Sequence, residues 1–322
     1  KALADNTTGA NNTAVGERGL YVNTTGANNV AIGAYALDAS NANNNVAIGY
    51  DALSANTSGT RGVAVGYAAL DANTTAADNT GIGNHALGAN TTGASNTAIG
   101  SYALDANTTA SHNIAVGREA LSANTTGADN IAIGSYSLDA NTTTSNNVAV
   151  GRSSLGSNTA ANNTAVGYNT LFANTTGTSN TAVGSYALDA NTTASNNTAV
   201  GGAALGANTT GDRNVAVGTY ALDANTTSDA NTAVGYNALG SNTTAEINTA
   251  IGFEALKLNT TGTANTAVGS GALDANTTAD YNTAVGQAAL GANTTASYNT
   301  AIGTSALTAN TTGAANVAVG VN

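Results

Sequence analysis

The residues of this chain that could take part in chemistry are few, and most recur at fixed intervals. Asn-Thr-Thr triplets such as Asn107-Thr108-Thr109 are Asn-x-Thr sequons, the acceptor sequence for N-linked glycans. Asn/Thr-rich turns create such triplets automatically, so the favoured interpretation is a structural ladder in which each asparagine bonds its neighbour one repeat away. The corner residues that could carry a glycan or a ligand are Asn107, Thr108, Thr109, Asn124, Thr125, Thr126, Asn141, Thr142, Thr143, Asn191, Thr192 and Thr193.

The other polar candidates give no reason to expect catalysis. His85 and His112 occupy unrelated places in the repeat and are expected to be variable surface residues. Recurrent aspartates lie mainly two repeats apart, roughly 9–10 Å, too far for neighbours to share one Ca²⁺ through short carboxylate bonds. The sequence therefore predicts no enzyme, cofactor or metal site. These aspartates are Asp38, Asp71, Asp105, Asp139, Asp189, Asp223 and Asp274.

Tyrosines share a place three residues before five of these aspartates. They could form a sparse aromatic stripe on which a glycan stacks, although packing over a neighbouring repeat is the favoured interpretation. They are Tyr35, Tyr102, Tyr136, Tyr186 and Tyr220.

All these residues belong to one repeating unit. An Ala-(Val/Ile)-Gly core recurs every 17 residues, shortened to 16 in the coils that begin at Val30 and Val148. The consensus is (T/V/I)-A-(V/I)-G-x-x-A-L-(D/G/S)-A-N-T-T-(G/A)-x-x-N, and its residues are called positions 1 to 17 below. Positions 1 to 3 favour a short strand, and the Asn-Thr-Thr-Gly segment favours a turn.

A short strand and turns in every repeat predict an all-β parallel β-solenoid of about 19 coils. Residues 1–322 are predicted to form a single continuous array, with a partial coil over 1–12, coils from 13 to 322 and no internal domain boundary. The absence of proline agrees, since almost every rung of a β-solenoid donates ladder hydrogen bonds.

The predicted core has two aliphatic ladders, formed by Val or Ile at position 3 and Leu at position 8. Ala at position 2 would then face the other way, because side chains alternate along a strand. So thin a core suggests that one face is buried against sister chains. The representative core residues are Ile99, Val116, Ile133, Val150, Leu104, Leu121, Leu138 and Leu155.

Composition limits the partners. The net charge is −11, and only seven Lys and Arg residues could contact phosphates, which argues against binding to nucleic acid or anionic membranes. No apolar run is long enough to insert into a membrane.

Two strings resemble a known family. "NTAVGSYAL" (Asn180 to Leu188) and "NIAIGSYSL" (Asn130 to Leu138) resemble the head repeats of YadA-like trimeric autotransporter adhesins. Strings like Asn163 to Gly177 are similar to those of bacterial and phage tail-fibre-like proteins. The resemblance implies a left-handed β-roll, a homotrimer, and a place at the surface of a cell or virion. The repeat is longer here than is common in that family, so no ligand site carries over.

We therefore expect a non-enzymatic extracellular fibre segment that projects or multiplies weak surface contacts, with its host surface, matrix or glycan receptor unknown. An alternative is a filament subunit, with or without glycans, that stacks end to end, because Lys1 and Asn322 both fall at position 6. A minor alternative is an ice-binding solenoid. It is disfavoured because the adjacent Thr108 and Thr109 would point to opposite faces, and because position 1 holds Thr in eleven coils but Val or Ile in eight.

Overall fold

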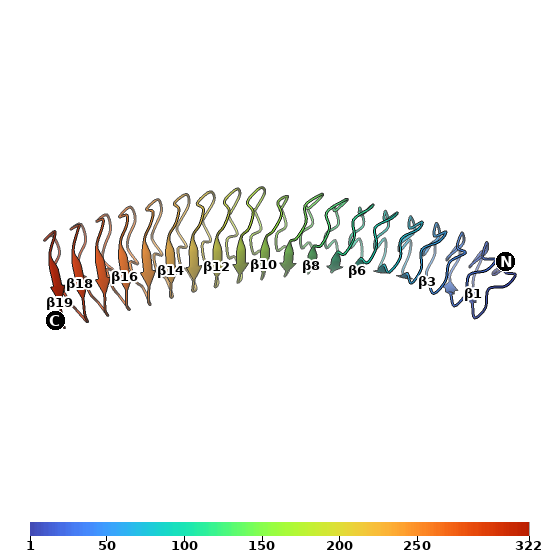
Figure 1. Cartoon of the computed structure of the whole chain (residues 1–322), viewed down its shortest axis with the longest axis horizontal. Helices are drawn as coiled ribbons and strands as arrows, with labels where there is room; N and C mark the ends of the chain where they lie inside the picture. The colour runs from blue at the N-terminus through green and yellow to red at the C-terminus, as the bar shows by residue number, and fades with distance from the viewer. Residues whose placement is uncertain (322) are drawn as a thin grey trace. The chain divides into compact units, whose positions relative to one another are not determined.

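The computed structural model describes residues 1–321, in two compact units that divide between Ala161 and Asn162. Each unit is a stack of coils, with one three-residue strand per coil and no helix among the described residues (Figure 1). The first unit holds β1 (Thr13–Val15), β2 (Val30–Ile32), β3 (Val46–Ile48), β4 (Val63–Val65), β5 (Thr80–Ile82), β6 (Thr97–Ile99), β7 (Ile114–Val116), β8 (Ile131–Ile133) and β9 (Val148–Val150). The second holds β10 (Thr164–Val166), β11 (Thr181–Val183), β12 (Thr198–Val200), β13 (Val215–Val217), β14 (Thr232–Val234), β15 (Thr249–Ile251), β16 (Thr266–Val268), β17 (Thr283–Val285), β18 (Thr300–Ile302) and β19 (Val317–Val319).

Successive strands of each unit pair in parallel, and equivalent repeat positions lie opposite one another. In the first unit Ala98 of β6 pairs with Ala115 of β7, and in the second Ala199 pairs with Ala216. The predicted parallel β-solenoid with a repeat of about 17 residues is therefore confirmed. The prediction of a single array without an internal boundary stays a prediction.

The turn after each strand depends on the glycine at position 4. Gly66 has φ of 137°, a conformation that L side chains rarely adopt. A Cβ on Gly66 would also overlap the carbonyl of Gly83 in the next coil. Stacked coils thus approach so closely at this turn that only glycine fits there.

The interior of the coil is narrower than the sequence suggested. Leu at position 8 is buried as predicted, with Leu104, Leu121, Leu138 and Leu155 all at 0% exposure. On the strand, however, the alanine of position 2 points inward: Ala132 is fully buried while Ile133 is 40% exposed.

The prediction that Ile99, Val116, Ile133 and Val150 point into the core is therefore wrong. All four lie on the outer face, where Ile99 and Ile133 are exposed and the two valines half-buried. The physical reason is space, because the buried leucine and asparagine side chains leave room only for a methyl group on the strand side. Side chains do alternate along the strand, with Ala of position 2 facing inward and Val or Ile of position 3 facing outward.

Asparagines fill the rest of the interior. At position 17, the Asn113 backbone N–H donates to Oδ1 of Asn96 at 2.9 Å, and its side-chain amide donates to the Gly127 carbonyl at 2.9 Å. Position 11 forms a second ladder. Buried amides are costly unless every polar atom finds a partner, so these ladders fix the register of the coils.

Candidate functional site

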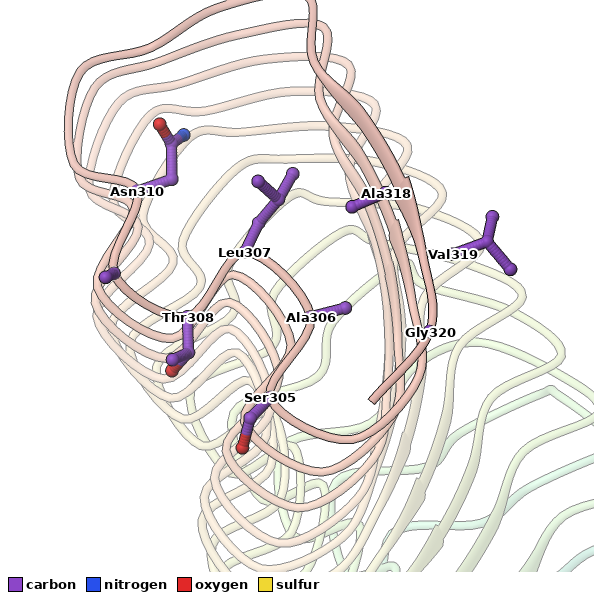
Figure 2. A pocket seen from close by; sticks show the side chains of 9 residues that line it. Ser305, Ala306, Leu307, Thr308, Asn310, Ala318, Val319 and Gly320 are labelled. Atoms are coloured by element: carbon purple, nitrogen blue, oxygen red, sulfur yellow. The ribbon is translucent and has the colours of Figure 1, made fainter. Parts of the chain in front are cut away.

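The first candidate surface is the outer face of the strands. Figure 2 shows both sides of one strand, with Ala318 pointing into the coil and Val319 pointing away from it. At position 3 every coil places Val or Ile on this outer face, and none of these side chains is buried. Representative exposures are 39% for Ile99, 40% for Ile251 and 36% for Val217.

Position 1 completes this surface, which we call the sheet face: the side chains of positions 1 and 3. Only Thr, Val and Ile occur at position 1, so the sheet face carries no charged side chain in any coil. The strands of the first unit mostly start with Val or Ile, whereas those of the second mostly start with Thr. An uncharged, largely aliphatic face suits contact with another apolar surface and offers no group for acid–base chemistry.

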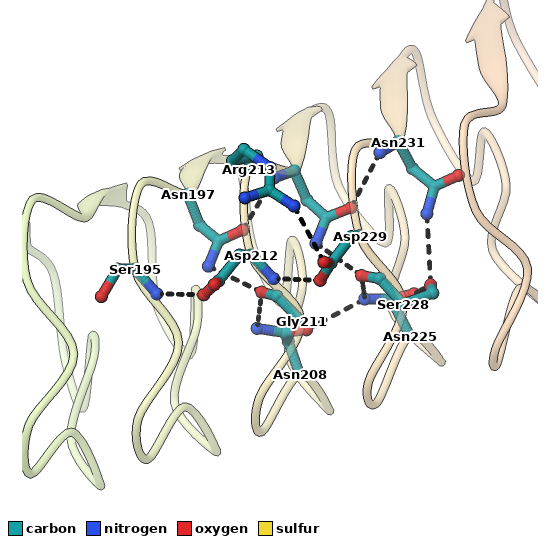
Figure 3. Close-up of polar contacts among 11 residues, drawn as sticks. Ser195, Asn197, Asn208, Gly211, Asp212, Arg213, Asn225, Ser228, Asp229 and Asn231 are labelled. Atoms are coloured by element: carbon teal, nitrogen blue, oxygen red, sulfur yellow. Dashed lines mark hydrogen bonds and ion pairs between the residues drawn. The ribbon is translucent and has the colours of Figure 1, made fainter.

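The second candidate is the Asn-Thr-Thr corner, whose asparagines face the interior and whose threonines lie at the surface. The asparagines at position 11 are buried except in the first and last coils, where Asn6 is exposed and Asn310 half-buried. Asn107 donates to Asn90 Oδ1 at 2.8 Å and to the Ala110 carbonyl at 3.0 Å. Figure 3 shows the same ladder in the second unit, where Asn225 donates to Asn208 Oδ1 at 2.9 Å.

A buried amide whose hydrogens are already donated cannot accept a glycan. The candidate glycan acceptors Asn107, Asn124, Asn141 and Asn191 are therefore not accessible in the folded chain, and the geometry supports the structural-ladder interpretation that the sequence favours. The threonines that follow do lie at the surface. Thr109, Thr126, Thr142, Thr143 and Thr193 are exposed, and Thr108, Thr125 and Thr192 are half-buried.

Exposed sequons occur elsewhere, at a place that sequence reasoning missed. Asn196-Asn197-Thr198 is a sequon whose first asparagine, at position 16, is exposed. Asn11 and Asn162 begin equivalent exposed sequons. A signal was available in the sequence, because position 16 changes residue type from coil to coil, as an outward-facing position can.

The third candidate is an aromatic edge along positions 5 and 6, next to the sheet face. In the first unit, neighbouring rings lie 5.4–5.7 Å apart from coil to coil. Tyr50 and Tyr67 are stacked with planes 7° apart, and His85 and Tyr102 with planes 5° apart. Ring-to-ring packing confirms that these rings cover neighbouring coils, and their outer edges remain open to solvent. The rings of this stack are Tyr35, Tyr50, Tyr67, His85 and Tyr102.

Aspartates of position 9 lie beside this edge, half-buried. Desolvation by burial raises the pKa of Asp105 and of Asp139 above the ordinary value for aspartate. No cluster of three or more His, Cys, Asp or Glu side chains that could hold a metal ion occurs among residues 1–321.

One cavity opens at the coil that carries β19 (Figure 2). Ala306, Leu307 and Ala318 line it, and their repeat positions are the ones that preceding coils keep buried. The lining includes no charged side chain. The cavity therefore exposes residues of the solenoid core and carries no catalytic group.

A scan against protein-family models finds no match, and a search of curated proteins finds no significant similarity. Over the part of the chain that the structure describes, no helix is long and apolar enough to cross a membrane.

Proposed function

We propose that this chain is a non-enzymatic segment of an extracellular fibre, in which copies of the chain pack against one another through their sheet faces. The observation that supports this most is the row of exposed or half-buried Val and Ile at position 3 within each unit. Water-soluble monomers rarely expose contiguous apolar patches beyond a few hundred Å². Covering this row removes apolar area from water at every coil.

The distribution of charge also favours contact between copies of the chain through the sheet face. Each copy carries a net charge of −11, so copies repel one another over most of their surface. The sheet face lacks charge in every coil, as the threonine corner also does, but only the sheet face is lined by Val and Ile at position 3, and copies can meet there without desolvating an ion.

Three copies in a left-handed roll is the assembly that the resemblance to YadA-like head repeats implies, and we adopt it here. A trimer of this kind would present each exposed corner many times, so individually weak contacts with a host surface or glycan would add up. The proposed role is that of a stiff segment that projects or multiplies attachment at the surface of a cell or virion.

The test uses one charged substitution on the sheet face and a matched one elsewhere in the same coil. Ile251→Glu places a carboxylate in the proposed interface, and Thr261→Glu places it on the exposed corner. Because Ile251 is 40% exposed in the single chain, both variants should keep the coil folded, as judged by circular dichroism. Analytical ultracentrifugation should give trimers for the wild type and Thr261→Glu, and smaller species for Ile251→Glu. A wild-type monomer, or equal assembly of both variants, would contradict the proposal.

A further inference from the structure

A tyrosine at position 6 and an aspartate at position 9, three residues apart, recur in five coils. In the first of these coils a tight turn brings the two residues together, and the Asp38 backbone N–H donates to the Tyr35 carbonyl at 3.3 Å. Each pair offers the π face or edge of a ring next to a half-buried carboxylate. The pairs are Tyr35 with Asp38, Tyr102 with Asp105, Tyr136 with Asp139, Tyr186 with Asp189, and Tyr220 with Asp223.

In the first unit, a basic side chain from the preceding coil lies against such a pair. The guanidinium of Arg18 lies 5.7 Å from the centre of the Tyr35 ring and forms a 2.9 Å ion pair with Asp38. The guanidinium of Arg118 lies 5.6 Å from the ring centre of Tyr136, and its ion pair, at 2.9 Å, is with Glu119 of its own coil. A cation over an aromatic face is attracted by the ring quadrupole, and a nearby carboxylate adds to that attraction.

The pair Tyr220 and Asp223 has no such neighbour. The preceding coil presents Gly202 and Ala203 at the two positions that hold the arginines elsewhere. The coils are nevertheless stacked in the same way, since the Tyr220 backbone N–H donates to the Gly202 carbonyl at 3.1 Å. A Cβ placed on Gly202 would meet only the Thr219 methyl, at 3.8 Å, so the space in front of it is open.

The charge around this opening is negative and unpaired. A Cβ on Gly206 would lie 2.9 Å from Asp223 Oδ1 and 3.6 Å from Asp189 Oδ1, so both carboxylates reach the same place. Neither carboxylate belongs to any of the ion pairs formed among residues 1–321. The Tyr220 ring is 45% exposed, and the Tyr186 ring borders the same glycine-rich coil from the other side at 43% exposure.

We propose that Tyr186, Tyr220, Asp189 and Asp223 bind a guanidinium group supplied from outside the chain, such as an arginine side chain of a partner protein. The external cation would take the place that Arg18 and Arg118 take within the chain. This site uses positions 6 and 9, so it goes beyond the proposed packing of copies through positions 1 and 3 and stands without it.

The probe is Nα-acetyl-arginine amide, titrated calorimetrically into the intact protein at low salt. The neutral isostere Nα-acetyl-citrulline amide reports the contribution of charge. We expect arginine to bind with a dissociation constant on the order of millimolar, weakened by added salt, and citrulline not to bind measurably. Equal binding of the two probes, or binding of neither, would overturn the proposal.

Two variants separate this site from general attraction to an acidic protein. Gly202→Arg supplies the guanidinium from the preceding coil, as Arg118 does for Tyr136, and should weaken binding of the arginine probe roughly tenfold. Ser270→Arg adds the same charge at position 5 of a coil whose next neighbour carries Ala288 and no tyrosine, and should leave binding unchanged. Melting temperatures check that both variants fold. Equal effects of the two variants would assign the binding to overall charge and reject the site.

Discussion

The side-chain amide of Asn107 donates to Oδ1 of Asn90 at 2.8 Å, one coil earlier in the same unit. Asn124 repeats the contact one coil later, donating to Asn107 Oδ1 at 3.1 Å. Each asparagine is thus both donor and acceptor in a buried row, and each also closes its own corner by donating to a backbone carbonyl three residues on. The row ties neighbouring coils together through hydrogen bonds that water cannot replace.

Replacing Asn107 by Ala should be strongly destabilising. The change leaves Asn90 Oδ1 and the Ala110 carbonyl without this donor and Asn124 Nδ2 without this acceptor. Buried polar atoms left unsatisfied cost about 1–3 kcal/mol each, so we expect a loss of about 3 kcal/mol in the free energy of unfolding. Thr109→Ala, on the exposed side of the same corner, should change it by less than about 0.5 kcal/mol. Chemical denaturation measures both, and similar values for the two variants would refute a structural role for the ladder.

Ser40→Asn should stabilise the first unit. Ser40 stands at position 11 of a shortened coil, and the preceding Asn23 has a buried Oδ1 without a hydrogen-bond partner. An asparagine can donate to that oxygen, as Asn107 does to Asn90, and can still accept from Asn56, which now donates to Ser40 Oγ at 3.2 Å. We expect a gain of about 1 kcal/mol by thermal or chemical denaturation. A loss of stability would mean that the shortened corner has no room for the longer side chain.

Ala230→Gly should also be stabilising, for a backbone reason. Ala230 is exposed and has φ of 58°, the left-handed region that costs a residue with a Cβ about 1 kcal/mol relative to glycine. Ala224→Gly in the same coil, at a position whose backbone is not left-handed, should instead cost about 0.5–1 kcal/mol. A gain in the free energy of unfolding for Ala230→Gly and a loss for Ala224→Gly would support this backbone explanation. A loss for both variants would contradict it.

The chain should become more heat-stable on mild acidification. Desolvation by burial raises the pKa of six aspartates at position 9, so the folded state binds their protons more tightly than the unfolded chain does. The resulting stability is fully present below the ordinary aspartate pKa of about 3.9 and is lost as pH rises through the raised values. Arg61 lowers the pKa of Asp78 and opposes the trend, but that pair is exposed and weak.

Calorimetry at fixed protein concentration should therefore show a higher melting temperature near pH 4 than at pH 7. The double substitution Asp105→Asn and Asp139→Asn removes two of the six groups and should reduce the difference. A wild-type melting temperature that falls as the pH is lowered from 7 to 4 would show that these carboxylates do not control its stability.

The sequence was sufficient to predict the coil and its period. Glycine at position 4, the β-branched residues around it and the turn residues each favour one local conformation, and the repetition makes the assignment secure. It was not sufficient to predict which side of the strand faces inward. Ala132 and Ile133 lie on opposite sides of the strand whichever of them faces inward, and hydrophobicity alone favours burying the isoleucine. The alanine faces inward because Leu138 and the buried asparagines leave too little interior volume for an isoleucine.

The same limit applies to the candidate sites. An Asn-Thr-Thr triplet looks the same whether its asparagine is buried, as Asn191 is, or exposed. The difference lies in contacts with the neighbouring coil, such as the hydrogen bond from Asn191 to Asn174, which a single repeat does not reveal. The opening beside Tyr220 likewise depends on how residues 17 apart stack, and comparing successive repeats column by column would have shown Gly202 in the place of an arginine.

The central claim is that the sheet faces of different copies lie against one another. The chain contains no cysteine, so Ile251→Cys provides a unique site for a nitroxide label on the sheet face. Pulsed electron paramagnetic resonance should then show a narrow distribution of distances between labels on different copies. It should be centred on the order of 10–20 Å, given the roughly 10 Å separation of packed sheets. Dilution with unlabelled protein should remove this signal. The same label at Thr261→Cys, on the exposed corner, should report much longer distances. Absence of any distance between copies for Ile251→Cys, at concentrations where the protein sediments as an oligomer, would contradict the claim.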